Sequence, residues 1–233
     1  MAKKNVAENK KIENKTQIDK LGTFISSYKI PLIAIVCVVV LAFVGFVVFE
    51  KVYGSVKASN LTAVEKIEYT LSLDAAGLSD EELTARYDAA LTSLEAYTKK
   101  GGIAGARANL LAAEILFRKN NFSSALENYL AAAKKTKGTY LAPICYFNAA
   151  IACEELNENE KALEYYQIAA DDKEFADPTH ALFSVGRLKE KALDYKGAKE
   201  AYEKITAKNN SQDPWSNLAK TRILSMQVEG KTE

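Results

Sequence analysis

Residues 30–49 are the most apolar stretch of the chain and read IPLIAIVCVVVLAFVGFVVF, with no charged side chain. At 1.5 Å per residue, a helix of this length spans about 30 Å, the hydrocarbon thickness of a bilayer. Buried helices of soluble proteins seldom run so far without a polar residue. A cleaved signal peptide fits poorly, because a long polar stretch precedes the run and the run exceeds a typical signal. The pattern therefore predicts an uncleaved transmembrane helix over residues 30–49.

Amphipathic helical patterns follow this run. Residues 55–73 predict a helix that continues from the membrane span, with Gly54 as a candidate hinge. The sequence SDEE at residues 79–82 is a capping box, in which a serine and a later glutamate satisfy backbone N–H groups, and it predicts a helix through about Lys99. We expect these helices to form a membrane-proximal pair, a diverged repeat over residues 50–103.

Three later segments, residues 113–132, 150–169 and 186–205, share one pattern: the end of a helix, a polar turn and a second helix rich in alanine. Small residues at matching positions let paired helices approach, and a tyrosine beside them fills the space while its hydroxyl can reach solvent. A single pair cannot bury its apolar face alone, so successive pairs must stack. The predicted packing positions are Ala113, Ala150 and Gly186; Ala125, Ala162 and Ala198; Tyr129, Tyr166 and Tyr202; and Ala132 and Ala169, with Ile205 in the third segment.

These small and aromatic positions resemble the tetratricopeptide repeat (TPR) family, whose unit has 34 residues. That frame gives three repeats within residues 104–212, at 106–139, 143–176 and 179–212. Asn109, Tyr146 and Leu182 stand where the family has Trp, and the terminal Pro is missing, so the repeats are degenerate. The expected fold is all-α, a single N-terminal transmembrane helix followed by a TPR-like α-solenoid of helical hairpins.

Helix ends are marked by aspartate–proline pairs. Asp177-Pro178 and Asp213-Pro214 each read as an N-cap followed by proline in the first turn. The second pair opens a predicted capping helix within residues 213–233, with Trp215 folded onto the third repeat.

Charge is uneven along the chain. Residues 1–29 form a Lys-rich tail with seven lysines against three acidic residues, and residues 1–20 are expected to be disordered. More lysines precede the apolar run than follow it, so the positive-inside rule favours a cytoplasmic N-terminus. The remaining chain is mildly acidic and lacks a basic stripe, which argues against nucleic-acid binding.

Candidate catalytic chemistry is sparse. The single histidine, His180, opens a predicted helix, and no cysteine or histidine pair has metal-ligand spacing. No glycine-rich phosphate loop follows a strand. We therefore expect no enzyme activity, no metal and no cofactor.

The TPR resemblance implies a concave groove lined by five positions of each repeat. These positions hold Arg107, Leu110, Glu114, Phe117 and Arg118; Ile144, Phe147, Ile151, Glu154 and Glu155; and His180, Phe183, Arg187, Glu190 and Lys191. The candidates for partner contact among them are Arg107, Leu110, Phe117, Arg118, Phe147, Ile151, Phe183 and Arg187. Phe117, Phe147 and Phe183 would form an apolar strip for a helix or peptide; alternatively, they pack within or between repeats.

The architecture also resembles bacterial inner-membrane TPR proteins of the YfgM type. That resemblance implies an accessory role in protein translocation or envelope protein biogenesis, with the repeats periplasmic and translocon, chaperone or envelope-assembly proteins as partners. A structural or oligomerising subunit of an envelope machine, such as a flagellar motor or secretion apparatus, is the alternative. The tethering subunit of an envelope enzyme is a third hypothesis.

Overall fold

The structure is a computed structural model that describes residues 19–207 and 212–231. Within these residues every regular element is helical, which confirms the predicted all-α class. The elements are α2 (Lys29–Ser72), the 3-10 turn η1 (Ala75–Gly77), α3 (Asp80–Thr98), α4 (Gly102–Arg118), α5 (Phe122–Lys135), α6 (Leu141–Glu155), α7 (Asn159–Asp171), α8 (Pro178–Lys191), α9 (Tyr195–Thr206) and α10 (Pro214–Val228). Two compact parts divide the chain, Met1–Val56 and Lys57–Glu233.

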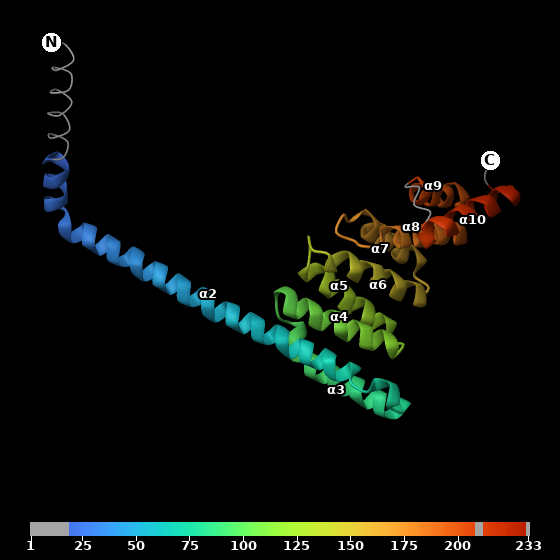
Figure 1. Cartoon of the computed structure of the whole chain (residues 1–233), viewed down its shortest axis with the longest axis horizontal. Helices are drawn as coiled ribbons and strands as arrows, with labels where there is room; N and C mark the ends of the chain where they lie inside the picture. The colour runs from blue at the N-terminus through green and yellow to red at the C-terminus, as the bar shows by residue number, and fades with distance from the viewer. Residues whose placement is uncertain (1–18, 208–211, 232–233) are drawn as a thin grey trace, which may run out of the picture. The chain divides into compact units, whose positions relative to one another are not determined.

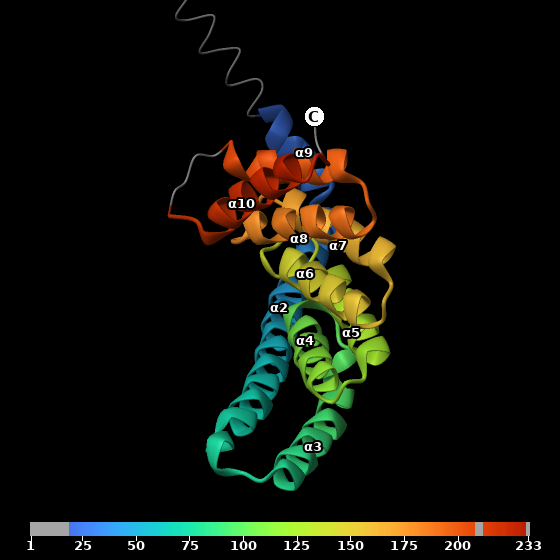
Figure 2. The same cartoon turned by 90° about the vertical axis from the view of Figure 1, so that its right-hand side faces the viewer.

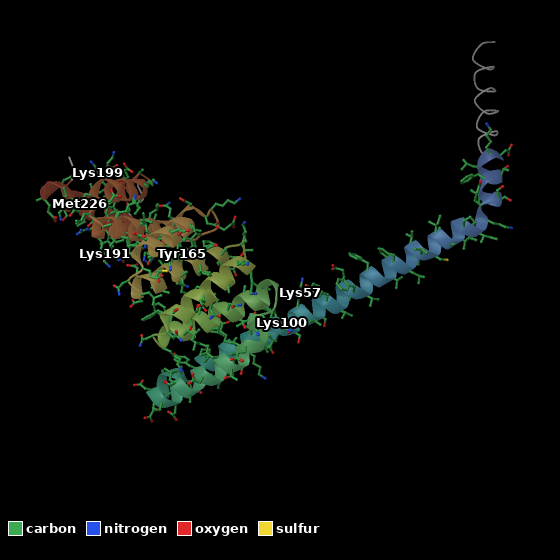
Figure 3. All side chains as sticks on the ribbon, turned by 180° about the vertical axis from the view of Figure 1, so that it is seen from behind. Lys57, Lys100, Tyr165, Lys191, Lys199 and Met226 are labelled. Atoms are coloured by element: carbon green, nitrogen blue, oxygen red, sulfur yellow. The ribbon has the colours of Figure 1, made fainter. Side chains whose placement is uncertain are left out.

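The N-terminal part contains the apolar run as the first half of α2. The most apolar 18-residue window of this helix has a mean hydropathy of 3.3, and none of it is buried. Its side chains project outward on every side (Figure 3). Among the described residues it is the one helix long and apolar enough to cross a membrane. Gly54, the candidate hinge, lies inside the helix, which continues without a break.

A short helix over residues 19–27, here the leading helix, precedes α2 and ends at a turn at Tyr28 (Figure 1). The expectation of disorder through residue 20 is therefore wrong at its end, because Asp19 and Lys20 are helical. The remainder of that expectation, residues 1–18, lies outside the described residues.

The predicted caps form as the sequence indicates. At the start of α3 the Ser79 N–H donates to Glu82 Oε2 at 2.9 Å, and the Glu82 N–H donates back to Ser79 Oγ at 3.3 Å. The Asp177 carboxylate accepts from the His180 N–H at 3.2 Å to open α8. The Asp213 carboxylate accepts from the Trp215 N–H at 3.1 Å to open α10. Each cap satisfies an N–H group that the first turn leaves without a partner.

In the C-terminal part, successive helices pair as α4 with α5, α6 with α7 and α8 with α9, and the pairs stack in chain order (Figure 2). The end of α2 joins this stack, since Val64 packs in one cluster with Leu94 of α3 and Leu111 of α4. At the other end, α10 lies against α8 and α9. All the predicted packing positions are buried: Ala113, Ala125, Tyr129, Ala132, Ala150, Ala162, Tyr166, Ala169, Gly186, Ala198, Tyr202 and Ile205. Small residues therefore lie where the paired helices meet.

Gly186 shows how tight this packing is. A Cβ atom added there would lie 2.4 Å from Tyr202 Cε1, well inside contact distance. The aligned positions of the first two repeats carry alanine, Ala113 and Ala150. Only the third repeat therefore requires a glycine beside its tyrosine.

The turn inside each helix pair uses a left-handed residue. Asn120, Asn157 and Leu193 have φ angles of 58°, 61° and 63°, at equivalent places in the three repeats. Asparagine tolerates this conformation, whereas a leucine there is strained. The third repeat thus keeps the turn geometry with an unfavourable residue.

Candidate functional site

The eight residues predicted for partner contact lie on the first helices of the three pairs. Arg107, Leu110, Phe117 and Arg118 belong to α4, Phe147 and Ile151 to α6, and Phe183 and Arg187 to α8. The structure divides them into residues that hold the fold together and residues that line a cavity.

Arg107 and Leu110 make contacts within the protein. The Arg107 guanidinium lies 3.5 Å from Glu65 Oε1 and 3.1 Å from Glu68 Oε2, which ties α4 to the end of α2. Leu110 is partly buried and packs against two core clusters, beside Ala106 and Ala113 among others.

Phe147 and Phe183 belong to a row of aromatic rings. The Phe147 and His180 ring centroids are 4.7 Å apart, those of His180 and Trp215 are 3.8 Å apart, and those of Trp215 and Phe183 are 5.4 Å apart. Burial lowers the pKa of His180, against the opposing effect of Asp177, and thereby favours the neutral ring within the row. These two phenylalanines pack between helices, as the packing alternative predicts, and Trp215 folds onto the third repeat.

A polar triad closes the junction between the second and third repeats. The Tyr166 hydroxyl donates to Glu154 Oε1 at 2.8 Å, and Arg187 Nη2 donates to Glu154 Oε1 and Oε2 at 2.6 Å and 2.7 Å. Burial disfavours the charge on Glu154, but the hydrogen bonds from Arg187 and Tyr166 outweigh it and hold the pKa of this carboxyl below its usual value. The triad thereby links α6, α7 and α8.

The same residue types recur one repeat later. Arg222 of α10 forms an ion pair with Glu190 of α8, and its Nε donates to Glu190 Oε1 at 3.2 Å. Tyr202, fully buried, lies next to this pair; burial raises the pKa of its hydroxyl and Glu190 raises it further. Among the described residues the Tyr202 hydroxyl has no hydrogen-bond partner, so the third junction is closed by the ion pair of Glu190 and Arg222, whereas the second is closed by the full triad.

The first junction, between the first and second repeats, differs at the two charged positions. Phe117 stands where the later repeats have glutamate, and Ile151 stands where they have arginine. A cavity of about 450 Å³ opens at this place. It is lined by Glu114, Phe117, Arg118, Tyr129, Asn148 and Ile151. Within the described chain no residue accepts a hydrogen bond from the Tyr129 hydroxyl, whereas its counterpart Tyr166 donates to Glu154.

Glu114, an acidic residue that lines this cavity, has a raised pKa. Glu114 as a residue is exposed, but local desolvation of its carboxyl by the cavity walls raises its pKa, the nearby Glu68 raises it further, and Arg118 and Arg107 only partly offset these effects. A second cavity, of about 490 Å³ and walled by α2, α3 and α4, is also lined by Glu114 and Arg118. In the part of the chain that the structure describes, neither side chain forms an ion pair, so both charges remain open to a ligand.

The structure thus brings Phe117, Arg118 and Ile151 together and adds Tyr129 and Asn148. Sequence reasoning treated Tyr129 only as a packing residue and did not single out Asn148. A signal was present in the aligned repeats, because the glutamate–arginine pair of the later junctions is replaced by two apolar residues at the first. Among the described residues, no group of three or more His, Cys, Asp or Glu side chains could hold a metal ion.

Comparisons with known proteins agree with this fold. No family model matches the chain. A protein of Treponema pallidum (strain Nichols) named "TPR repeat-containing protein" is 31% identical over 157 residues, which are 66% of this chain and 65% of that protein. The chain therefore spans somewhat less than two thirds of the relative it matches.

Two solved structures are similar in shape. BtubC (BKLC) from P. vanneervenii superposes with a TM-score of 0.56 at 20% identity, over 78% of this chain and 79% of that one. The apo form of RapI gives a TM-score of 0.47 at 19% identity, over 64% of this chain and 55% of that one. The stacked helix pairs therefore form a TPR-like helical-repeat fold, and in sequence the chain is similar to the Treponema TPR repeat-containing protein.

Proposed function

We propose that the chain is a membrane-anchored scaffold that captures a protein partner at its first junction. The observation that carries this proposal is the cavity at Phe117 and Ile151, in a position that both later junctions close with an ion pair. TPR-like repeat proteins act as protein-interaction scaffolds, and an open, partly apolar groove is what such a role requires.

The cavity suits a peptide or helix that carries an apolar side chain beside a charged one. Phe117 and Ile151 offer apolar walls, and the Tyr129 hydroxyl and Asn148 amide offer hydrogen-bonding groups. Glu114 loses solvation on burial, so a cationic group of the partner would restore its favourable environment. Arg118 can pair with an acidic neighbour.

The anchor in this proposal is the apolar half of α2. None of its most apolar 18-residue window is buried, and lipid is the solvent that matches such side chains. Tyr28 and Tyr53 flank the apolar run, at places where aromatic rings favour the membrane interface. The lysine excess before the run favours a cytoplasmic N-terminus, which puts the repeats on the extracytoplasmic face of a bacterial inner membrane.

In that compartment the scaffold would serve as an accessory factor in protein translocation or envelope protein biogenesis, without catalysis of its own. A photo-crosslinking residue in place of Asn148, in the full chain in native membranes, tests this role. We expect adducts with translocon, chaperone or envelope-assembly proteins. The same residue in place of Glu164, exposed on α7, is the matched control and should give few adducts. Adducts of the chain with itself would instead favour a structural, oligomerising subunit.

A double substitution tests the cavity directly. Phe117→Glu with Ile151→Arg introduces the pair of the later junctions and should close the groove, so the adducts from position 148 should disappear. Phe117→Leu with Ile151→Leu keeps the site apolar and should retain them. Adducts that persist in the charged variant, with helicity unchanged by circular dichroism, would contradict the proposal.

Topology has its own test. Protease added to intact spheroplasts should digest the repeats if they are extracytoplasmic. A repeat region that is protected until the cells are lysed would invert the proposed orientation while leaving the binding site untouched.

A further inference from the structure

The leading helix has one apolar face. Leu21, Phe24 and Ile25 lie on it and Tyr28 follows at its end, a spacing of i, i+3, i+4 and i+7. Positions with this spacing line one side of a helix. These four side chains are 58%, 55%, 53% and 53% exposed, so the described protein leaves the apolar face uncovered. The Phe24 and Tyr28 ring centroids lie 4.9 Å apart, which makes the face continuous.

The opposite face is polar. At 100° per residue, Asp19, Thr23 and Ser26 project away from the apolar stripe. The Thr23 hydroxyl donates to the Asp19 carbonyl at 2.8 Å, along the helix. Lys20 lies at the flank of the stripe, and Lys29 follows its end as the first residue of α2. The leading helix therefore combines an aromatic, apolar side with basic margins, the pattern of helices that lie in a lipid interface.

A bend separates the leading helix from α2. The Tyr28 N–H donates to the Phe24 carbonyl at 3.0 Å and completes the last turn, and the chain then changes direction into α2 (Figure 1). The charge-free apolar run begins two residues later, at Ile30. The uncovered face therefore lies at the end of the segment that would enter the bilayer, where lipid headgroups and acyl chains meet.

We propose that residues 19–28 form an interfacial anchor that lies on an anionic phospholipid surface. Leu21, Phe24, Ile25 and Tyr28 insert among the upper acyl chains, and Lys20 and Lys29 contact the phosphate groups. The inference rests on the membrane anchoring proposed for α2. It adds a second contact with the same leaflet, which would fix the height of the span in the bilayer.

Site-directed spin labelling of the full chain tests this anchor. Single cysteines at Phe24 and Ile25 sample the apolar face, and cysteines at Thr23 and Ser26 sample the polar face. The background replaces Cys37, Cys145 and Cys153 with alanine, and each variant is reconstituted into phosphatidylcholine–phosphatidylglycerol vesicles. Oxygen relaxes labels in lipid, whereas a water-soluble nickel chelate relaxes labels in water. We expect the ratio of oxygen to nickel accessibility to be several-fold higher at positions 24 and 25 than at 23 and 26. The contrast should weaken in vesicles of phosphatidylcholine alone.

Two outcomes would overturn the anchor. Equal nickel accessibility on both faces would show that the helix stands in water, and equal oxygen accessibility would show that it merely extends the span. A label at Val40, inside the apolar run, separates this result from the larger proposal. Lipid exposure at position 40 with no contrast among the four helix positions refutes the interfacial anchor alone. Water exposure at position 40 refutes the membrane span.

Discussion

The first and second junctions of the repeat region have the same helix stacking but different side chains at the groove positions. At the second, the Tyr166 hydroxyl, Glu154 and Arg187 form a hydrogen-bonded triad across three helices. At the first, Tyr129 occupies the equivalent place, but the charged partners are absent and a cavity remains. The helix pairs stack at both junctions.

This difference separates the positions that stack the helix pairs from the two charged positions that close a junction. The alanines and tyrosines between helices bury apolar area at every junction and determine how the pairs stack. The groove positions then either join neighbouring repeats or stay open. An ion pair across the groove forms its hydrogen bonds within the protein. A junction without such a pair leaves its groove positions available to a ligand.

The largest effect is expected in the helix packing of the third repeat. Gly186→Ala should lower the free energy of unfolding by about 2 kcal/mol, because its Cβ would overlap the Tyr202 ring. Ala150→Gly, the exchange in the opposite direction at the aligned position, should cost only about 1 kcal/mol from helix propensity. Urea unfolding of the detergent-solubilised chain, followed by far-ultraviolet circular dichroism, measures both. A neutral Gly186→Ala would show that Tyr202 can move aside.

The second-largest loss of stability is expected at the ion pair of Glu154 and Arg187 in the second junction. Arg187→Ala leaves the Glu154 carboxylate, only 19% exposed, without its partner. We expect a loss of about 1–2 kcal/mol, between the value of an exposed pair and that of a fully buried one. Arg118→Ala at the first junction removes no ion pair and should change stability by less than about 0.5 kcal/mol. Equal losses in the two variants would remove the distinction between a closed and an open junction.

Substitution of the tyrosine at each junction tests the same difference between them. Tyr166→Phe deletes a hydrogen bond to a carboxylate and should cost about 1 kcal/mol. Tyr129→Phe deletes a hydroxyl that faces the cavity and should be nearly neutral for stability, yet weaken partner crosslinking from position 148. Hydrogen exchange would locate the first effect at α6 to α8. A large stability loss in Tyr129→Phe would mean that its hydroxyl is bound within the protein.

The smallest effect is a pH dependence of opposite sign at the two junctions. The pKa of Glu154 is lowered, so the stability it contributes is present above its ordinary value of 4.5 and is lost as pH falls through the folded-state pKa. The pKa of Glu114 is raised above 4.5, so ionisation with rising pH destabilises the native state.

Glutamine variants test both pH dependences of stability. Glu154→Gln should be less stable than the parent at pH 7, and Glu114→Gln should be more stable. Both differences should shrink as pH falls below the respective folded-state pKa. Urea midpoints across this range decide the matter, and a Glu114→Gln variant that is less stable at pH 7 would contradict an unpaired, desolvated carboxylate at this place.

Local features of the chain could be predicted from sequence because their causes are local. The capping box at Ser79 and the proline after Asp177 act within one turn of helix, so they predict where α3 and α8 begin. The charge-free run needs only its own length to predict a helix able to span a bilayer. The recurring alanines and tyrosines report helix contacts, because close approach demands small residues at a regular spacing.

Contacts between repeats were decided only by the tertiary structure. Glu154 and Arg187 are 33 positions apart, and their pairing depends on how α6 and α8 face each other. Phe147 and Phe183 occupy equivalent positions in the second and third repeats, and His180 and Trp215 engage their rings. The pKa of Glu114 depends on burial and on Glu68 from another helix. Burial and charge act through space, so the open junction emerged only once the stacked helices had brought distant residues together.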